Sequence, residues 1–187
     1  MNKLFVLVLS IFLILPSFNS FAEEKVEYYE QVYLTEKQAL DMVFKDLKVE
    51  KKQITATKDK KNIIQKRLKR KIKEDTFTYY FAKKSNNENI YAWILDEHGK
   101  HRPITFIVSI NNKITVEQVA IMIYREKRGA EVQKKRFLNQ FNNKSSKDEI
   151  QVNQDIINIT GATISSWSVS AGVKKALVLT EELIIKK

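Results

Sequence analysis

Residues 104–124 read ITFIVSINNKITVEQVAIMIY and contain two strand-like runs joined by a short turn. Asn111-Asn112-Lys113 forms the turn, because asparagine tolerates the left-handed backbone conformations that hairpins need. On either side, apolar residues recur with the period of two that is typical of a strand with one buried face. These apolar residues are Ile104, Phe106, Val108 and Ile110 before the turn, and Val119, Ile121 and Ile123 in the strand that we expect to start at Ile114 after it.

Two further strands are predicted upstream of this hairpin. Phe77, Tyr79 and Phe81 alternate with other residues, and Ile90–Leu95 forms a more fully apolar run. Four strands with short connections favour antiparallel pairing. Helical spacing predicts four helices, over residues 36–47, 59–73 and 131–141 and over about the last 20 residues. The sequence therefore predicts a single α+β domain with a four-stranded, mainly antiparallel sheet packed by helices.

Polar residues mark where two of these helices begin. Thr35-Glu36-Lys37-Gln38 has the pattern of a capping box, in which the threonine hydroxyl and the glutamine amide satisfy free N–H groups. Ser165 or Ser166 is the predicted N-cap of the closing helix.

The first residues indicate export. Lys3 supplies a positive charge, an apolar run follows from Leu4 to Leu15, and Ser20-Phe21-Ala22 places small residues where a signal peptidase cuts. A membrane-spanning helix needs about 20 apolar residues, so this run is too short to be an anchor. We expect a signal peptide over residues 1–22 and no transmembrane span in the mature chain.

Composition excludes several kinds of redox centre. The chain has no cysteine and two histidines, which rules out disulfides, haem attachment through C-x-x-C-H and cysteine-ligated iron–sulfur clusters. A zinc site is also disfavoured. An organic cofactor is the remaining candidate for any redox work.

The formal net charge of +11 is concentrated in one stretch. Lys58–Lys73 carries nine lysines and arginines and a single acid, Asp59. A basic helix can meet nucleic acid, an anionic lipid surface or an acidic partner, and it can also be an ordinary solvated face. Outside the cytoplasm nucleic acid is the least expected of these partners, so we expect no nucleic-acid partner.

The loop Asn158–Ser166 carries the chemistry. It offers hydroxyl groups, a flexible glycine and a small alanine immediately before a helix N-terminus. Free N–H groups and the helix dipole at such a position favour an anion, phosphate above all.

Thr160-Gly161-Ala162-Thr163 followed by Ile164-Ser165-Ser166 resembles the signature of FMN-binding domains, a serine or threonine followed by Gly-Ala-Thr, any residue, a serine or threonine, and Ser. That family includes flavoprotein subunits of the sodium-pumping quinone reductase and Rnf complexes and small exported relatives. The resemblance covers about Phe77–Leu177, through the segments Gly99–Phe106, Tyr124–Val132 and Arg136–Phe141. It assigns residues 23–75 to an N-terminal helical part and 76–187 to the FMN-binding domain.

The resemblance implies FMN as cofactor, esterified through its phosphate to Thr163 by a flavin transferase. Residues on the phosphate side of the implied site are Thr160, Gly161, Ala162, Ser165 and Ser166. Residues on the ring side are His101, Arg125, Glu126 and Gly129. Glu126–Gly129 corresponds to a Glu-Thr-Pro-Gly turn of the larger members, with Lys127-Arg128 in place of Thr-Pro.

The chain departs from the family pattern at one position. The modification motif has an aspartate six residues before the accepting threonine, where this chain has Ile157. Three explanations stay open: the transferase tolerates Ile157, Asp155 substitutes for the aspartate, or FMN is held without a covalent bond.

The main functional prediction is a non-enzymatic, extracytoplasmic electron carrier, periplasmic in preference to fully secreted, alone or in a membrane-associated complex. Its partners would be the flavin transferase and an unidentified redox protein, met through the basic Lys58–Lys73 stretch. The alternative is a non-redox exported binding module that uses the basic helix on anionic surfaces. An oxidoreductase with its own substrate would need an acid, a base or a substrate pocket that the sequence does not indicate.

Overall fold

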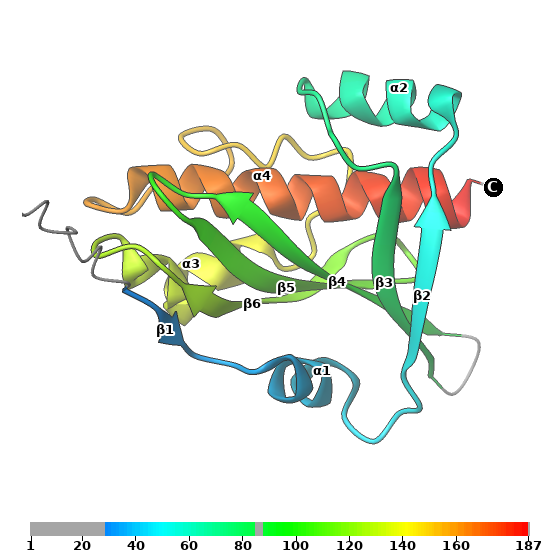
Figure 1. The fold of residues 1–187 in the computed structure, drawn as a ribbon, viewed down its shortest axis with the longest axis horizontal. Coiled ribbons are helices and arrows are strands. Elements are labelled where there is room, and N and C mark those ends of the chain that lie inside the picture. Colours follow the sequence, from blue (N-terminus) through cyan, green and yellow to red (C-terminus); the bar gives the residue numbers. More distant parts are fainter. Residues whose placement is uncertain (1–28, 85–87, 187) are drawn as a thin grey trace, which may run out of the picture.

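The computed structural model describes residues 29–84 and 88–186, which form an α+β fold (Figure 1). The predicted signal peptide lies outside these residues. Among the helices of the described chain, none is long and apolar enough to cross a membrane.

The sheet has six antiparallel strands in the order β1-β6-β5-β4-β3-β2. The strands are β1 (Gln31–Val32), β2 (Glu50–Thr55), β3 (Thr76–Lys83), β4 (Asn89–His98), β5 (Pro103–Asn111) and β6 (Val116–Tyr124). The α+β class and the antiparallel sheet are confirmed, but the expectation of four strands is wrong. The two strands that were missed are the edges, β1 and β2. Edge strands are often charged and exposed, so their sequence lacks the apolar alternation of the central strands.

The turn between β5 and β6 is held by the side chain of Asn111. Asn111 Oδ1 accepts hydrogen bonds from the backbone N–H groups of Lys113 and Thr115, at 3.0 and 3.1 Å. The positive φ of 59° falls on Ile114, not on an asparagine. As a result, β6 begins at Val116, two residues after the predicted start.

Three of the four predicted helices are shorter than the apolar spacing indicated, whereas the closing helix of about 20 residues is confirmed by α4 and its continuation to Ile185. The helices are α1 (Glu36–Phe44), α2 (Lys58–Leu68), α3 (Lys135–Leu138) and α4 (Thr163–Leu179), with 3₁₀ turns η1 (Ala130–Gln133) and η2 (Asn139–Phe141) and a π-helical end η3 (Thr180–Ile185). The Thr35–Gln38 capping box is confirmed. The helix predicted to reach residue 73 ends at Leu68, because Lys69 adopts a left-handed conformation with φ of 53°. Residues 131–141 form three short pieces instead of one helix.

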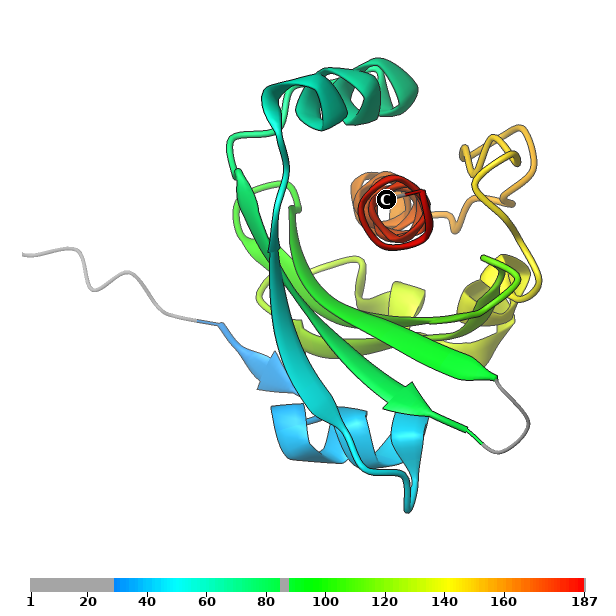
Figure 2. The same cartoon turned by 90° about the vertical axis from the view of Figure 1, so that its right-hand side faces the viewer.

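The sheet curls around α4, which lies along its concave face (Figure 2). The main apolar core fills the space between them, and Trp93 inside it donates from Nε1 to Thr180 Oγ1 at 2.8 Å. A second apolar cluster joins α1 to the opposite face of the sheet, with Phe44 fully buried. Packing against β4 and β5 fixes the position of α4 on the sheet, and therefore the position of its N-terminus.

Ion pairs attach α2 to η3, and Arg70 just after α2 to β4. Arg67 pairs with Glu181 at 2.8 Å and with Glu182 at 2.6 Å, and Arg70 makes two 2.7 Å hydrogen bonds to the Glu97 carboxylate. Both arginines of the basic stretch therefore make internal contacts. Only part of the stretch forms the solvated face that its charge suggested.

Candidate functional site

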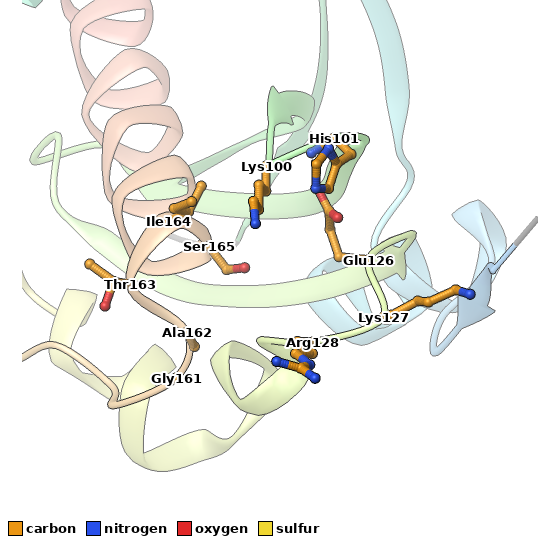
Figure 3. Close-up of a pocket in the computed structure, with 10 residues that line it drawn as sticks. All are labelled: Lys100, His101, Glu126, Lys127, Arg128, Gly161, Ala162, Thr163, Ile164 and Ser165. Atoms are coloured by element: carbon orange, nitrogen blue, oxygen red, sulfur yellow. The ribbon is translucent and has the colours of Figure 1, made fainter.

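A cavity of about 460 Å³ opens at the N-terminal end of α4 (Figure 3). Three segments that are far apart in the sequence meet there: the β4–β5 turn, the loop after β6, and the first turn of α4. The residues that line it are Lys100, His101, Glu126, Lys127, Arg128, Gly161, Ala162, Thr163, Ile164 and Ser165.

The N-terminus of α4 is left without a side-chain cap. The helix begins at Thr163, its N-cap is Ala162, and no side-chain hydrogen bond caps it. The prediction that Ser165 or Ser166 would be the N-cap is therefore wrong, because both serines lie inside the helix and are buried. Uncapped N–H groups at the positive end of a 17-residue helix attract an anion.

Thr163 places an exposed hydroxyl at this helix end. Its Oγ1 accepts a hydrogen bond from Asn158 Nδ2 at 3.0 Å, while Asn158 Oδ1 is buried with no partner among the described residues. Ala162 before it is 2% exposed, and Gly161 takes a positive φ of 83°. The loop therefore turns sharply into the helix, where Thr163 is an exposed residue.

Hydrogen bonds from Tyr124 hold the loop after β6 against the first turn of α4. The Tyr124 phenol donates to the carbonyl of Arg128 at 2.6 Å, and Ser165 Oγ lies 2.8 Å from the same phenol oxygen. Because the phenol proton goes to Arg128, the serine hydroxyl donates to Tyr124. Burial raises the pKa of Tyr124, and the hydrogen bond with Ser165 opposes that effect. One phenol thus ties two walls of the cavity together.

Gly129 is required where this loop passes Tyr124. Its φ is +90°, and a Cβ there would lie 2.7 Å from Tyr124 Oη and 2.8 Å from Ser165 Oγ. This positive φ comes five residues after β6 ends.

Glu126 organises the β4–β5 turn. Its carboxylate accepts the backbone N–H groups of His101 at 2.5 Å and Arg102 at 2.9 Å. Burial would raise the pKa of Glu126, but the N–H groups of His101 and Arg102 outweigh it, and the pKa is lowered. The carboxylate is therefore committed to holding a turn in the charged form, which leaves it a poor proton acceptor for chemistry in the cavity.

Cations approach the helix N-terminus from two sides. Lys100 comes from the β4–β5 turn on one side of the cavity, and Arg128 comes from the loop after β6, next to Gly161 and Ala162 (Figure 3). A guanidinium and an ammonium beside free N–H groups are suited to phosphate. The cavity also lies within the size range of small-molecule sites. The uncapped N-terminus of α4, the two cations and the size of the cavity together fit a phosphate-bearing ligand such as FMN.

Most of the predicted site residues meet in this cavity. Those that line it are His101, Glu126, Gly161, Ala162, Thr163 and Ser165. Gly129 lies behind the wall, against Tyr124 and Ser165, and Ser166 is fully buried within α4. Sequence reasoning did not select four lining residues, Lys100, Lys127, Arg128 and Ile164. Their proximity in sequence to His101, Glu126 and Thr163 was the available signal.

Two predicted residues point elsewhere. Arg125 pairs with Glu30 at 2.7 Å and donates to Thr105 Oγ1 at 2.8 Å, away from the cavity-lining set. Thr160 lines a second cavity of about 510 Å³, formed by η1, α3 and the earlier part of the same loop.

Asp155, the acid nearest to Ile157 in the sequence, is already engaged in hydrogen bonds and an ion pair. Asp155 accepts the backbone N–H groups of Ile150 and Gln151 at 3.1 and 2.8 Å and pairs with Lys144 at 2.9 Å. Burial would raise the pKa of Asp155, but the backbone N–H group of Gln151 and the side chain of Lys144 outweigh it, and the pKa is lowered. Ile157, by contrast, is 73% exposed on the surface of the loop. Asp155 therefore serves the loop's own structure.

Metal binding finds no support in the described part of the chain, where no group of His, Asp or Glu could hold an ion. No curated protein matches the chain. The family model of the FMN-binding domain matches residues 99–178, which include every residue that lines the 460 Å³ cavity. The match begins at the β4–β5 turn, so it is shorter than the resemblance from Phe77 onward. Residues 99–178 of this chain thus match the FMN-binding domain family, which indicates FMN as the cofactor.

Proposed function

We propose that the protein is an exported electron carrier that holds FMN through its phosphate at Thr163. The observation that carries this proposal is the exposed Thr163 hydroxyl, at the uncapped N-terminus of α4 and on the edge of the cavity. A phosphoester at Thr163 places the phosphate against free N–H groups, where the helix dipole stabilises its charge.

The residues of the cavity then divide into two tasks. The first turn of α4 with Arg128 and Lys100 binds the phosphate, and the Glu126-ordered turn brings His101 over the rest of the cavity. FMN supplies one- and two-electron redox chemistry when bound, and the protein anchors and orients it. Glu126, the one carboxylate in the lining, is hydrogen-bonded to backbone N–H groups. This arrangement favours a carrier over an enzyme that moves protons on a substrate.

Export is part of the proposal because of residues 1–22, whose sequence has the three regions of a secretory signal. Covalent attachment suits that location, since dissociated FMN could not be replaced outside the cytoplasm. The periplasm is the proposed compartment, with a flavin transferase as the partner that forms the ester.

The test is to produce the full chain in a host that exports it together with a flavin transferase. Intact mass and visible absorption are recorded before and after denaturation. We expect yellow colour that survives denaturation and a mass increase of one FMN less a water. Colour that washes out on denaturation would overturn the ester, and a protein that takes up no FMN would overturn the proposed function.

Matched variants locate the attachment. Thr163→Val keeps the shape of the side chain and removes the hydroxyl, so it should lose the covalent flavin, whereas Thr163→Ser should retain it. Asn139→Ala, at an exposed position outside the signature, is the control and should be loaded like the natural chain. Ile157→Asp restores the aspartate of the family motif at an exposed position, and faster loading of this variant would mean that the transferase reads that side chain.

A further inference from the structure

An exposed apolar ridge runs along α4 immediately beside the FMN cavity. Ile164 and Trp167 are three residues apart, so they are neighbours on one helix face, and each is 47% exposed. Ile164 also lines the cavity itself. Large apolar side chains grouped at the mouth of a site are a marker of an interaction surface.

Lysines flank the ridge on both sides. Lys100, at the cavity mouth, lies on the side of the β4–β5 turn, and Ile164 lines the same cavity (Figure 3). On the other side, Trp167 and Lys69 line a recess of about 350 Å³ between α4 and the end of α2. Both lysines are exposed, and in the described parts of the chain neither takes part in a salt bridge. Arg67 and Arg70, by contrast, are committed to internal carboxylates.

We propose that the Ile164–Trp167 ridge and Lys69 beside it dock an acidic one-electron carrier protein, which exchanges electrons with the flavin. This inference rests on the proposed function, because it assigns the partner of the same site. An apolar centre with a charged rim is the usual anatomy of a transient protein interface. Charges on the rim steer the encounter, and Trp is over-represented among the residues that hold such complexes together.

The acidic sign of the partner follows from the charge of the surface. The chain carries a formal net charge of +11, and Lys69 beside Trp167 forms no salt bridge within the described residues, whereas Lys100 is assigned to the FMN phosphate. A basic partner would be repelled at the encounter, and a neutral one would not be steered. Docking at the ridge brings the partner to the mouth of the cavity and not to the sheet edge.

The probe is a reduced plant-type ferredoxin, an acidic protein that gives up one electron from its iron–sulfur cluster. Two reduced ferredoxins and two protons from solvent fully reduce one bound FMN. The second-order rate of flavin bleaching is measured by anaerobic stopped flow with the FMN-loaded full chain. Trp167→Ser and Lys69→Glu test the ridge, since neither residue lines the FMN cavity. Lys48→Glu is the control, because it makes the same charge change in the exposed α1–β2 connection on the other face of the sheet.

We expect Lys69→Glu to lower the rate about fivefold at low salt, and the difference to vanish at high salt. Trp167→Ser should lower it about tenfold at either salt concentration. Lys48→Glu should change the rate by no more than about twofold. Reduction by dithionite should be the same in all four proteins.

Wild-type rates for both ridge variants, or an equal loss for Lys48→Glu, would overturn the docking site while leaving the flavin carrier intact. A chain that binds no FMN would overturn the proposed function and this inference with it. The dithionite measurement separates the two cases, because it reports on the flavin without any protein partner.

Discussion

Tyr124 and Ser165 form a buried hydrogen bond at 2.8 Å, although 41 residues separate them in the chain. Tyr124 ends β6, and Ser165 lies in the first turn of α4. The same phenol donates to the carbonyl of Arg128. The geometry of the FMN cavity therefore depends on one side chain that does not line it.

Removing the Tyr124 hydroxyl should loosen this part of the cavity. Tyr124→Phe leaves the Arg128 carbonyl and the Ser165 hydroxyl without their partner, which costs about 1–3 kcal/mol of unfolding free energy. Urea unfolding followed by circular dichroism measures the loss. Tyr29→Phe, at an exposed position, should change stability by less than about 0.5 kcal/mol. Equal stability of the natural chain and Tyr124→Phe would contradict the role assigned to the phenol.

Two glycines with positive φ should respond differently to alanine. Gly161→Ala meets no heavy atom within 4 Å, so it bears only the backbone strain of about 1–2 kcal/mol. Gly129→Ala bears the same strain and also places its Cβ 2.7 Å from Tyr124 Oη. Overpacking of this kind adds about 1–3 kcal/mol. Thermal unfolding of the two variants in parallel measures the difference, and equal losses would show that Tyr124 moves aside without cost.

The pattern of apolar residues could predict the four central strands, because each buries one face or both. β2 could not be recognised in this way, since it reads Glu-Lys-Lys-Gln-Ile-Thr with no fully buried residue. The structure shows why a charged strand fits: Lys52 lies 4.4 Å from the centre of the Phe81 ring, and Lys51 lies 5.5 Å from that of Tyr80. Lysine stems cover the aromatic faces and keep the sheet edge charged.

The part of the site that lies in one local motif could be predicted from the sequence. The part that depends on which way a side chain points could not. The loop around Thr163 follows from its sequence alone. Arg125 was predicted to lie on the ring side of the site, yet it is held by Glu30 and Thr105, while Arg128 reaches the cavity. Ser165 and Ser166 were mistaken for caps because buried hydroxyls in a helix look the same in sequence as exposed ones.

The free energy of unfolding should depend on pH through the ionisation of Glu126. The lowered pKa of this carboxyl means that it stabilises the fold above its ordinary value of 4.5, and that this stabilisation is lost as the pH falls through the lowered pKa. Glu126→Gln removes the charge, so it should cost about 1 kcal/mol at pH 7 and progressively less on acidification. Urea unfolding over a pH series measures the convergence. Glu117→Gln, an exposed carboxyl of β6, is the control, and a difference for Glu126→Gln that does not change with pH would contradict the prediction.

The ion pairs of Arg67 should hold α2 to the end of α4. Burial would raise the pKa of Glu181, but hydrogen bonds from Lys186, Ser146 and Arg67 lower it to about 2. Arg67→Met leaves Glu181 and Glu182 less compensated, which should cost about 2–4 kcal/mol at pH 7. The loss should shrink below pH 4.5 as the carboxyls take up protons. Lys66→Met, on an exposed position of the same helix, should change the unfolding free energy by less than about 0.5 kcal/mol.

Asn158 should set the rate at which Thr163 receives FMN. Its amide holds the Thr163 hydroxyl in place at 3.0 Å, which leaves the hydroxyl proton free to be removed during ester formation. Asn158→Ala loses one orienting hydrogen bond of about 1 kcal/mol, so covalent loading should slow about fivefold. The time course of intact mass, with purified flavin transferase and its flavin donor, measures this rate. Asn139→Ala, on the exposed η2 turn, should load at the natural rate. If Asn158→Ala loads equally fast, the hydroxyl must be oriented by the transferase and not by the chain that carries it.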